Sequence, residues 1–167
     1  MRLFIAVDLS DKMKTALIGT MHELKQQGIT GNYVPKQNLH MTLAFIGETK
    51  EIELVKKVMD SLPVEKGRLS FSGYTYFGDI FVAGIKGNQK IKKYAADLRK
   101  ALKDNGLPCD MTKFEPHVTL VRKIKGRQPQ NLPVPDADMT ITKVSLMKSE
   151  NQNGKQVYKE VYSVTAS

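Results

Sequence analysis

Two copies of the pattern His-x-Thr lie 77 residues apart in this chain of 167 residues, and they limit how it can fold more than any other feature. The first copy is His40 with Thr42, and the second is His117 with Thr119. The same offset of 77 links Leu43 to Leu120 and the stretch Phe4-Ile5-Ala6 to Phe81-Val82-Ala83. These matches favour a duplicated unit in which equivalent strands carry equivalent side chains.

Hydrophobic periodicity predicts a strand, a helix and a histidine-bearing strand in the same order around each copy. Ser10 and Asn88 are suitable N-caps for the first and third helices, and Asn153-Gly154 is typical of a hairpin turn. In the first half we expect strands at about 2–8 and 39–46 and helices at about 11–27 and 49–61. In the second half we expect a helix at about 88–105 and strands at about 68–76, 79–85, 114–122, 139–149 and 156–165.

The repeat predicts one domain over residues 1–167 with two lobes, at approximately 1–67 and 68–167. A chain of this length is long enough to bury a single well-packed core. If a pseudo-twofold axis relates the lobes, equivalent strands face one another across a central cleft. The sequence therefore predicts that His40 and His117 meet in that cleft.

The His-x-Thr spacing puts an imidazole and a hydroxyl on the same face of each strand, because side chains at i and i+2 share a face. Opening a cyclic phosphodiester requires a base that takes a proton from water and an acid that protonates the departing oxygen. Histidine, with an ordinary pKa of ~6.5, can fill either role near neutral pH. Thr42 and Thr119 can donate hydrogen bonds to the phosphate oxygens. The residues alone do not distinguish the donor histidine from the acceptor.

A single His-x-Thr has almost no specificity, but two copies use two of the three histidines at the repeat offset. The third, His22, lies off the apolar stripe of its helix, and we expect it to be exposed. Arg122 alternates off the His/Thr face of a regular strand, although its long side chain is near enough to the strand end to reach a phosphate. The aromatic rings of Tyr33, Phe45 and Tyr76 could each stack on a nucleotide base, although packing within the protein is the commoner role of such residues.

Composition favours an anionic partner and a metal-free site. The formal net charge is +9 and the sequence pI is about 9.6, as suits binding to RNA or a generally basic surface. Cys109 is the only cysteine, which suits a reducing cytoplasm. Two histidines without cysteines or a carboxylate cluster fall short of a catalytic zinc site, so we expect no metal and no cofactor. The chain has no apolar stretch near the ~20 residues that span a bilayer, and its start reads as a strand rather than a signal peptide.

Four segments of the chain carry a family resemblance. They are Arg2–Leu9 (RLFIAVDL), Asn38–Gly47 (NLHMTLAFIG), Phe114–Arg122 (FEPHVTLVR) and Val144–Glu150 (VSLMKSE). Together they resemble the RNA 2′,3′-cyclic phosphodiesterases, also called 2′-5′ RNA ligases, of the two-histidine phosphoesterase superfamily. The likeness runs from the first strand to the closing hairpin, and the paired His-x-Thr motifs are its specific part.

The resemblance implies a bilobal α+β fold, with two antiparallel sheets around a cleft, helices outside and no metal. It implies hydrolysis of a terminal 2′,3′-cyclic phosphate to a 2′-phosphomonoester, with reversible 2′-5′ ligation in some members. By position, His40 is then the proton donor and His117 the proton acceptor, while Thr42 and Thr119 hold the phosphate.

The sequence leaves two alternatives open. One is another two-histidine activity, on 2′-5′ linked oligonucleotides or on a cyclic phosphate of an ADP-ribose derivative. The other is a non-catalytic RNA-binding module, for which the net charge of +9 is the support. In the favoured interpretation the partners are RNA with 2′,3′-cyclic phosphate ends or cyclic nucleotides, with no membrane and no obligate protein partner. One monomer suffices for such a site, because both histidines belong to one chain.

Overall fold

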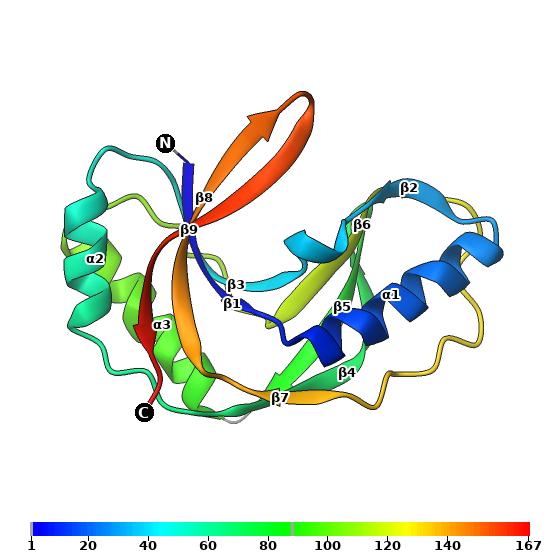
Figure 1. Cartoon of the computed structure of the whole chain (residues 1–167), viewed down its shortest axis with the longest axis horizontal. Helices are drawn as coiled ribbons and strands as arrows, with labels where there is room; N and C mark the ends of the chain where they lie inside the picture. Colours follow the sequence, from blue (N-terminus) through cyan, green and yellow to red (C-terminus); the bar gives the residue numbers. More distant parts are fainter. Residues whose placement is uncertain (1, 88) are drawn as a thin grey trace.

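The computed structural model describes residues 2–87 and 89–167 and shows a curled antiparallel sheet with three α-helices (Figure 1). Its helices are α1 (Asp11–Gln26), α2 (Ile52–Asp60) and α3 (Gln89–Asp104), with a short 3-10 turn η1 (Lys36–Asn38). Its strands are β1 (Arg2–Asp8), β2 (Thr30–Tyr33), β3 (His40–Glu48), β4 (Arg68–Phe77), β5 (Ile80–Gly87), β6 (His117–Lys125), β7 (Asp138–Thr140), β8 (Lys143–Gln152) and β9 (Lys155–Thr165). The predicted α+β class is confirmed.

Most of the predicted elements are present, and local signals explain their ends. The Ser10 hydroxyl caps α1 by accepting a hydrogen bond from the backbone N–H of Met13 at 3.2 Å. Asn153 and Gly154 have φ angles of 54° and 80°, the conformation of a tight hairpin turn, and join β8 to β9. The proposed cap Asn88 lies outside the described residues.

The strands differ from the prediction in three respects. The strand expected at 114–122 is β6, which starts three residues later, after Pro116, because proline cannot donate to a sheet ladder. The strand expected at 139–149 is two strands, since β7 pairs with β4 whereas β8 pairs with β1 and β9. The short strand β2 was not predicted, because its Thr-Gly-Asn-Tyr sequence has no apolar alternation.

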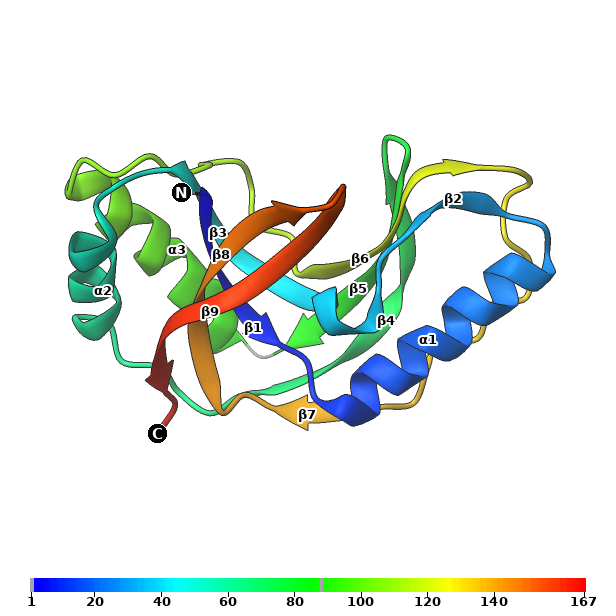
Figure 2. The same ribbon diagram turned by 45° about the horizontal axis from the view of Figure 1, so that its top comes forward.

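The strands form one sheet rather than the two that were expected. All pairings are antiparallel, in the order β7-β4-β5-β6-β3-β1-β8-β9, with β2 also paired to β6. The two histidine strands meet in the middle through the single pair Met41–Val118 and then separate. Because β3 and β6 diverge after this contact, the sheet curls around a concave face (Figure 2).

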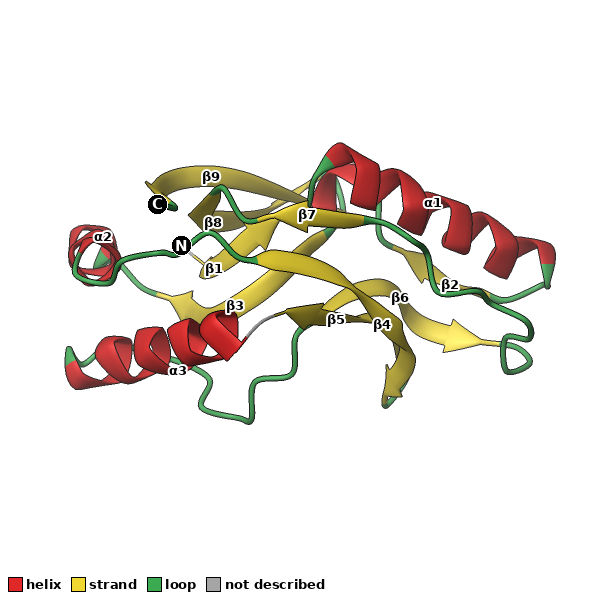
Figure 3. Ribbon diagram, turned by 90° about the horizontal axis from the view of Figure 1, so that it is seen from below, coloured by secondary structure: helices red, strands yellow, loops and turns green. Residues whose placement is uncertain are grey.

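The two halves of the sheet do not coincide with the two halves of the chain. The C-terminal hairpin β8–β9 lies beside β1, and β2 pairs with β6. Helix α1 packs over the strands of the second half, where the hydroxyls of Thr20 and Tyr74 are 2.8 Å apart. Helix α3 lies with α2 at the other end, and its Arg99 Nε donates to the carbonyl of Leu43 at 2.9 Å (Figure 3). Most of the buried apolar side chains of both halves belong to one core cluster.

None of the helices in the described part of the chain is long and apolar enough to cross a membrane.

Candidate active site

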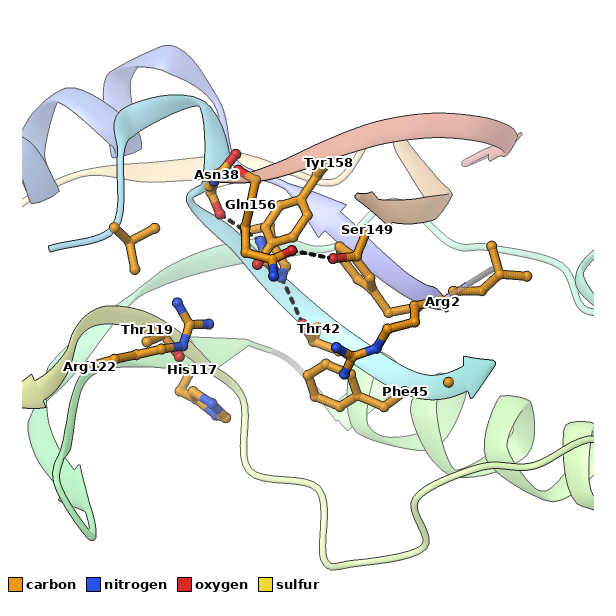
Figure 4. A pocket seen from close by; sticks show the side chains of 15 residues that line it. Arg2, Asn38, Thr42, Phe45, His117, Thr119, Arg122, Ser149, Gln156 and Tyr158 are labelled. Carbon is orange, nitrogen blue, oxygen red and sulfur yellow. Dashed lines mark hydrogen bonds between the residues drawn. The ribbon is translucent and has the colours of Figure 1, made fainter. Parts of the chain in front are cut away.

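One pocket on the concave face contains both His-x-Thr pairs. His40 and Thr42 of β3 line it. His117 and Thr119 of β6 line it from the other side, and Figure 4 shows these two side chains together with Thr42. Strand β1 and the hairpin β8–β9 complete its walls. Its volume of about 520 Å³ is in the range of nucleotide-sized ligands. Each histidine strand turns its alternate residues, such as Met41 and Val118, into the core with no exposure.

The two imidazoles are oriented in the same way. Nδ1 of His40 donates to the carbonyl oxygen of Asn38 at 2.7 Å, and Nδ1 of His117 donates to the carbonyl oxygen of Glu115 at 2.6 Å. A carbonyl can only accept, so each Nδ1 must carry a proton. The remaining nitrogen, Nε2, is therefore the atom of each ring that can take up or release a proton.

A bulge in each histidine strand brings a third side chain onto the His/Thr face. In β3 the pairing with β1 skips Leu43, and in β6 the pairing with β5 skips Leu120. Two consecutive residues of each strand then face the core, and alternation resumes one residue later. Arg122 thus returns to the face of His117 and Thr119, and it lines the pocket. The expectation that Arg122 alternates off this face assumed a regular strand and is corrected.

Phe45 is the equivalent of Arg122 on β3, again at an offset of 77. It also lines the pocket, and 54% of the residue is exposed. Of the three aromatic residues considered for base stacking, Phe45 is the one in this position. Tyr33 instead donates its hydroxyl to the carbonyl of Ile29, and Tyr76 packs edge-on against Phe81.

The surroundings of the two imidazoles differ. The His40 ring packs against both Phe4 and Tyr158, with ring centroids 4.9 and 5.2 Å away. This burial lowers the pKa of His40; its hydrogen bond to the Asn38 carbonyl opposes the effect, while the positive charge of Arg122 adds to it. Nε2 of His40 also lies 2.9 Å from the Thr42 hydroxyl, which donates to it when the ring is neutral. His117 has one aromatic neighbour, Phe77, whose ring stands edge-on at 4.9 Å.

The pocket lining is positively charged. Arg2 and Arg122 both contribute guanidinium groups, and no carboxylate is present among the described residues that line it. Together with the two threonine hydroxyls, the arginines provide donors on several sides of the space between the histidines. This donor set suits an anion with several oxygens, such as a phosphoryl group.

The hairpin β8–β9 contributes residues that sequence reasoning missed. Ser149, Gln156 and Tyr158 line the pocket, and the Ser149 hydroxyl donates to the Gln156 side-chain oxygen at 2.7 Å (Figure 4). Asn38, only 7% exposed, donates from Nδ2 to the backbone carbonyl of Gln156 at 3.0 Å. Asn38 therefore joins the hairpin to the strand of His40. No sequence signal relates these two residues, which are 118 positions apart.

The remaining candidates from the sequence lie elsewhere. His22 is exposed on α1 and hydrogen-bonds to Gln26, as expected. Within the described ranges, no three His, Cys, Asp or Glu side chains are grouped as metal ligands would be. Metal independence remains a prediction.

With this geometry established, comparison with known families defines the class of the protein. The model of the 2′-5′ RNA ligase superfamily matches residues 14–153. The chain belongs to this superfamily.

Relatives agree with this assignment. The chain is 29% identical to the RNA 2′,3′-cyclic phosphodiesterase of Thermotoga maritima, over 73% of this chain and 70% of the relative. It is also 29% identical to the enzyme of the same name from Archaeoglobus fulgidus, over 78% and 76% of the two chains. Among solved structures, E. coli LigT in its apo form superimposes with a TM-score of 0.83 at 22% identity, covering 99% of this chain and 96% of LigT, and shows the same fold.

Proposed function

We propose that this protein hydrolyses 2′,3′-cyclic phosphates at RNA ends, or on nucleotides, to 2′-phosphomonoesters without a metal ion. The observation that carries the proposal is the pair of histidines in one cationic pocket, each with Nδ1 tied to a carbonyl and Nε2 left for proton transfer. The names of the relatives from Thermotoga maritima and Archaeoglobus fulgidus support the same reaction.

The proposed reaction is an in-line displacement at phosphorus. Nε2 of His117 accepts a proton from water as the water oxygen attacks phosphorus. The bond between phosphorus and O3′ breaks, and Nε2 of His40 donates its proton to O3′. The phosphate stays on O2′. His117 has gained one proton and His40 has lost one. General acid–base catalysis of this kind is worth on the order of 10²–10⁴ in rate for each group.

The other side chains of the pocket stabilise the charge on phosphorus. Thr42 and Thr119 donate to the two non-bridging oxygens, and Arg122 adds a charge-assisted hydrogen bond. A bound phosphate is also an anion beside His40, which favours the charged imidazole. Substrate therefore counteracts the burial that lowers the pKa of His40 in the free enzyme.

The same site supports ligation in principle. If a 5′-hydroxyl of a second RNA replaces water, the same two proton transfers form a 2′-5′ phosphodiester. The reaction is reversible because His117 then acts as the acid and His40 as the base. A monomer suffices for either direction, since both histidines come from one chain.

The test is incubation of the purified protein with 2′,3′-cyclic UMP in EDTA across pH 5–8, with the product followed by ³¹P NMR. We expect 2′-UMP as the sole product and no effect of the chelator. Formation of 3′-UMP would contradict the assigned leaving group. Absence of turnover on cyclic mononucleotides and on cyclic-phosphate-ended RNA would contradict the proposed hydrolysis and favour a non-catalytic RNA-binding protein.

A further inference from the structure

The two histidine strands carry histidine, threonine and leucine at equivalent positions and then differ in charge. Past Thr119, β6 continues with Arg122 and Lys125, whereas the equivalent positions of β3 are Phe45 and Glu48. The catalytic groups are near-symmetric, so they do not by themselves determine which way a substrate lies. Glu48 lies opposite Arg2 of β1, so this part of the β3 side adds no net positive charge, and a polyanion is attracted more strongly along β6.

Strand pairing places Lys125 on the same face as Arg122. In the antiparallel pair with β2, Arg122 lies opposite Asn32 and Lys125 lies opposite Thr30. Opposite residues of such a pair point to one face, and Thr30 and Asn32 share a face because they are two apart. Arg122 and Lys125 therefore share a face as well, although they are three residues apart.

A second bulge in β6 makes this possible. Lys123 and Ile124 together oppose the single residue Gly31, and Lys123 has a left-handed φ of 53°. Ile124 packs against the core on the opposite side. His117, Thr119, Arg122 and Lys125 therefore form a continuous row along one face. Lys125 and Arg122 lie opposite Thr30 and Asn32, which are two residues apart, so at ~3.3 Å per residue Lys125 lies roughly 7 Å beyond Arg122.

The positively charged residues of β6 extend from the pocket toward the edge of the molecule. Strand β6 begins at the pocket, and its far end lies beside β2 at the end of the molecule that holds α1 (Figures 1 and 2). Arg127 follows in a loop that is held to the end of α1, where Gln27 exchanges two hydrogen bonds with the backbone of Gln130 at 2.7 and 2.9 Å. Lys123, Lys125 and Arg127 are all exposed.

These cations are available for an external anion. In the described part of the chain, none of Lys123, Lys125 and Arg127 forms an ion pair, whereas ten other ion pairs hold lysines and arginines elsewhere. Asp79 approaches this strand through its backbone, whose carbonyl accepts from the N–H of Ile124. Its carboxylate pairs with none of the three cations in the residues described.

We propose that Lys125 and Arg127 form a phosphate-binding track that continues from Arg122 and guides the body of an RNA strand out of the pocket along β6. This inference rests on the proposed function, since the 3′-terminal cyclic phosphate occupies the histidine pocket and the preceding nucleotides lie along the track. It makes an RNA end, rather than a mononucleotide, the preferred substrate. Single-stranded RNA fits such a track because its phosphates neutralise a row of cations in any sequence.

The decisive experiment compares the double variant Lys125→Ala/Arg127→Ala with the control Lys92→Ala/Lys103→Ala. The control removes the same charge from exposed positions on α3, at the opposite end of the molecule. The substrates are 2′,3′-cyclic UMP and a ten-nucleotide oligouridylate that ends in a 2′,3′-cyclic phosphate. We expect the double variant to lose about tenfold in kcat/KM on the oligonucleotide, mainly through KM, and to hydrolyse cyclic UMP at the wild-type rate.

Binding gives an independent measurement. Fluorescence anisotropy with the same oligonucleotide ending in a 2′-phosphate should show weaker binding by the double variant. Its plot of log affinity against log salt concentration should be shallower by about 1.4, or ~0.7 for each RNA phosphate that the variant no longer neutralises. Equal losses in the control variant, equal losses on cyclic UMP, or unchanged oligonucleotide affinity would each overturn the track. Weaker binding in a protein without turnover would support the track and reject the proposed hydrolysis.

Discussion

At the scale of single residues, the site depends on two imidazoles with the same tether and different surroundings. Each Nδ1 donates to the carbonyl two positions earlier in the chain, from His40 to Asn38 and from His117 to Glu115. Both rings therefore present Nε2 in a defined tautomer. Burial against Phe4 and Tyr158 distinguishes His40 from His117.

We predict that His40→Ala and His117→Ala each lower kcat for cyclic UMP by about 10²–10⁴. Each change removes one proton transfer and leaves the core in place, because both histidines lie on the pocket face of their strands. Thr42→Ala and Thr119→Ala should cost less, since each removes one hydrogen-bond donor. Steady-state kinetics measures the effect, circular dichroism checks the fold, and His22→Ala is the matched control. Near-wild-type rates in either catalytic variant would exclude the two-histidine mechanism.

The pH dependence should differ between the free and the substrate-bound enzyme. Burial lowers the pKa of His40, so as a proton donor it is already deprotonated at a pH below the ordinary ~6.5. We therefore predict that the alkaline limb of kcat/KM lies below pH ~6.5. In the pH profile of kcat, the alkaline limb should lie at higher pH, because the bound phosphate raises the pKa of His40. Coincident limbs in the two profiles would contradict this account.

Stability provides a second readout of the same group. The neutral form of His40 is favoured in the folded protein, so the unfolded chain binds more protons between the folded pKa and ~6.5. The free energy of unfolding should therefore fall as the pH drops through this window. Denaturant unfolding should show a smaller fall for His40→Gln than for the wild type.

At the scale of elements, bulges determine which side chains reach the pocket. The bulge at Leu120 returns Arg122 to the His/Thr face, and the second bulge, opposite Gly31, does the same for Lys125. Gly31 is needed there, since an added Cβ would lie 2.7 Å from Cγ1 of Val121 and 3.0 Å from the carbonyl oxygen of Arg122.

We predict that Gly31→Ala lowers the free energy of unfolding by about 3 kcal/mol, through a strained φ of 150° and through overpacking. It should also raise KM, because β6 shifts at Arg122. The control is Gly28→Ala, which has a φ of 79° but no neighbouring atom within 4 Å of the added Cβ. Gly28→Ala should lower the free energy of unfolding by about 1–2 kcal/mol and leave KM unchanged. Denaturant titration and steady-state kinetics measure both effects, and equal behaviour of the two variants would exclude the packing role of Gly31.

At the scale of the whole molecule, strands from the first half of the chain pair with strands from the second half. Strand β1 pairs with β8, β2 pairs with β6, and α1 packs on strands of the second half. We predict that fragments 1–67 and 68–167 are each unfolded when expressed alone, because each would expose the apolar face that the other covers. Circular dichroism and NMR dispersion of the fragments, against the intact chain, measure this. A fragment that folds cooperatively alone would contradict the single-domain interpretation.

Local periodicity in the sequence is sufficient to predict several features of the fold and of the site. The spacing of Met13, Leu17, Met21 and Leu24 predicted α1, and all four side chains are buried. The alternation around His40 and His117 identified two strands with polar pocket faces and apolar core faces. The 77-residue offset related those strands, and β3 and β6 have the same length at that offset. These patterns are readable because adjacent residues of a helix or strand are fixed in relative orientation.

The pairing of the strands could not be predicted from these local patterns, and the three-dimensional structure is needed to define it. It joined the expected two sheets through Met41 and Val118, placed the hairpin with Ser149, Gln156 and Tyr158 over the pocket, and turned Arg122 onto the His/Thr face. Each of these outcomes depends on the register between strands that are distant in the chain. A bulge inserts one residue relative to a partner strand, and no spacing within a single strand reveals it.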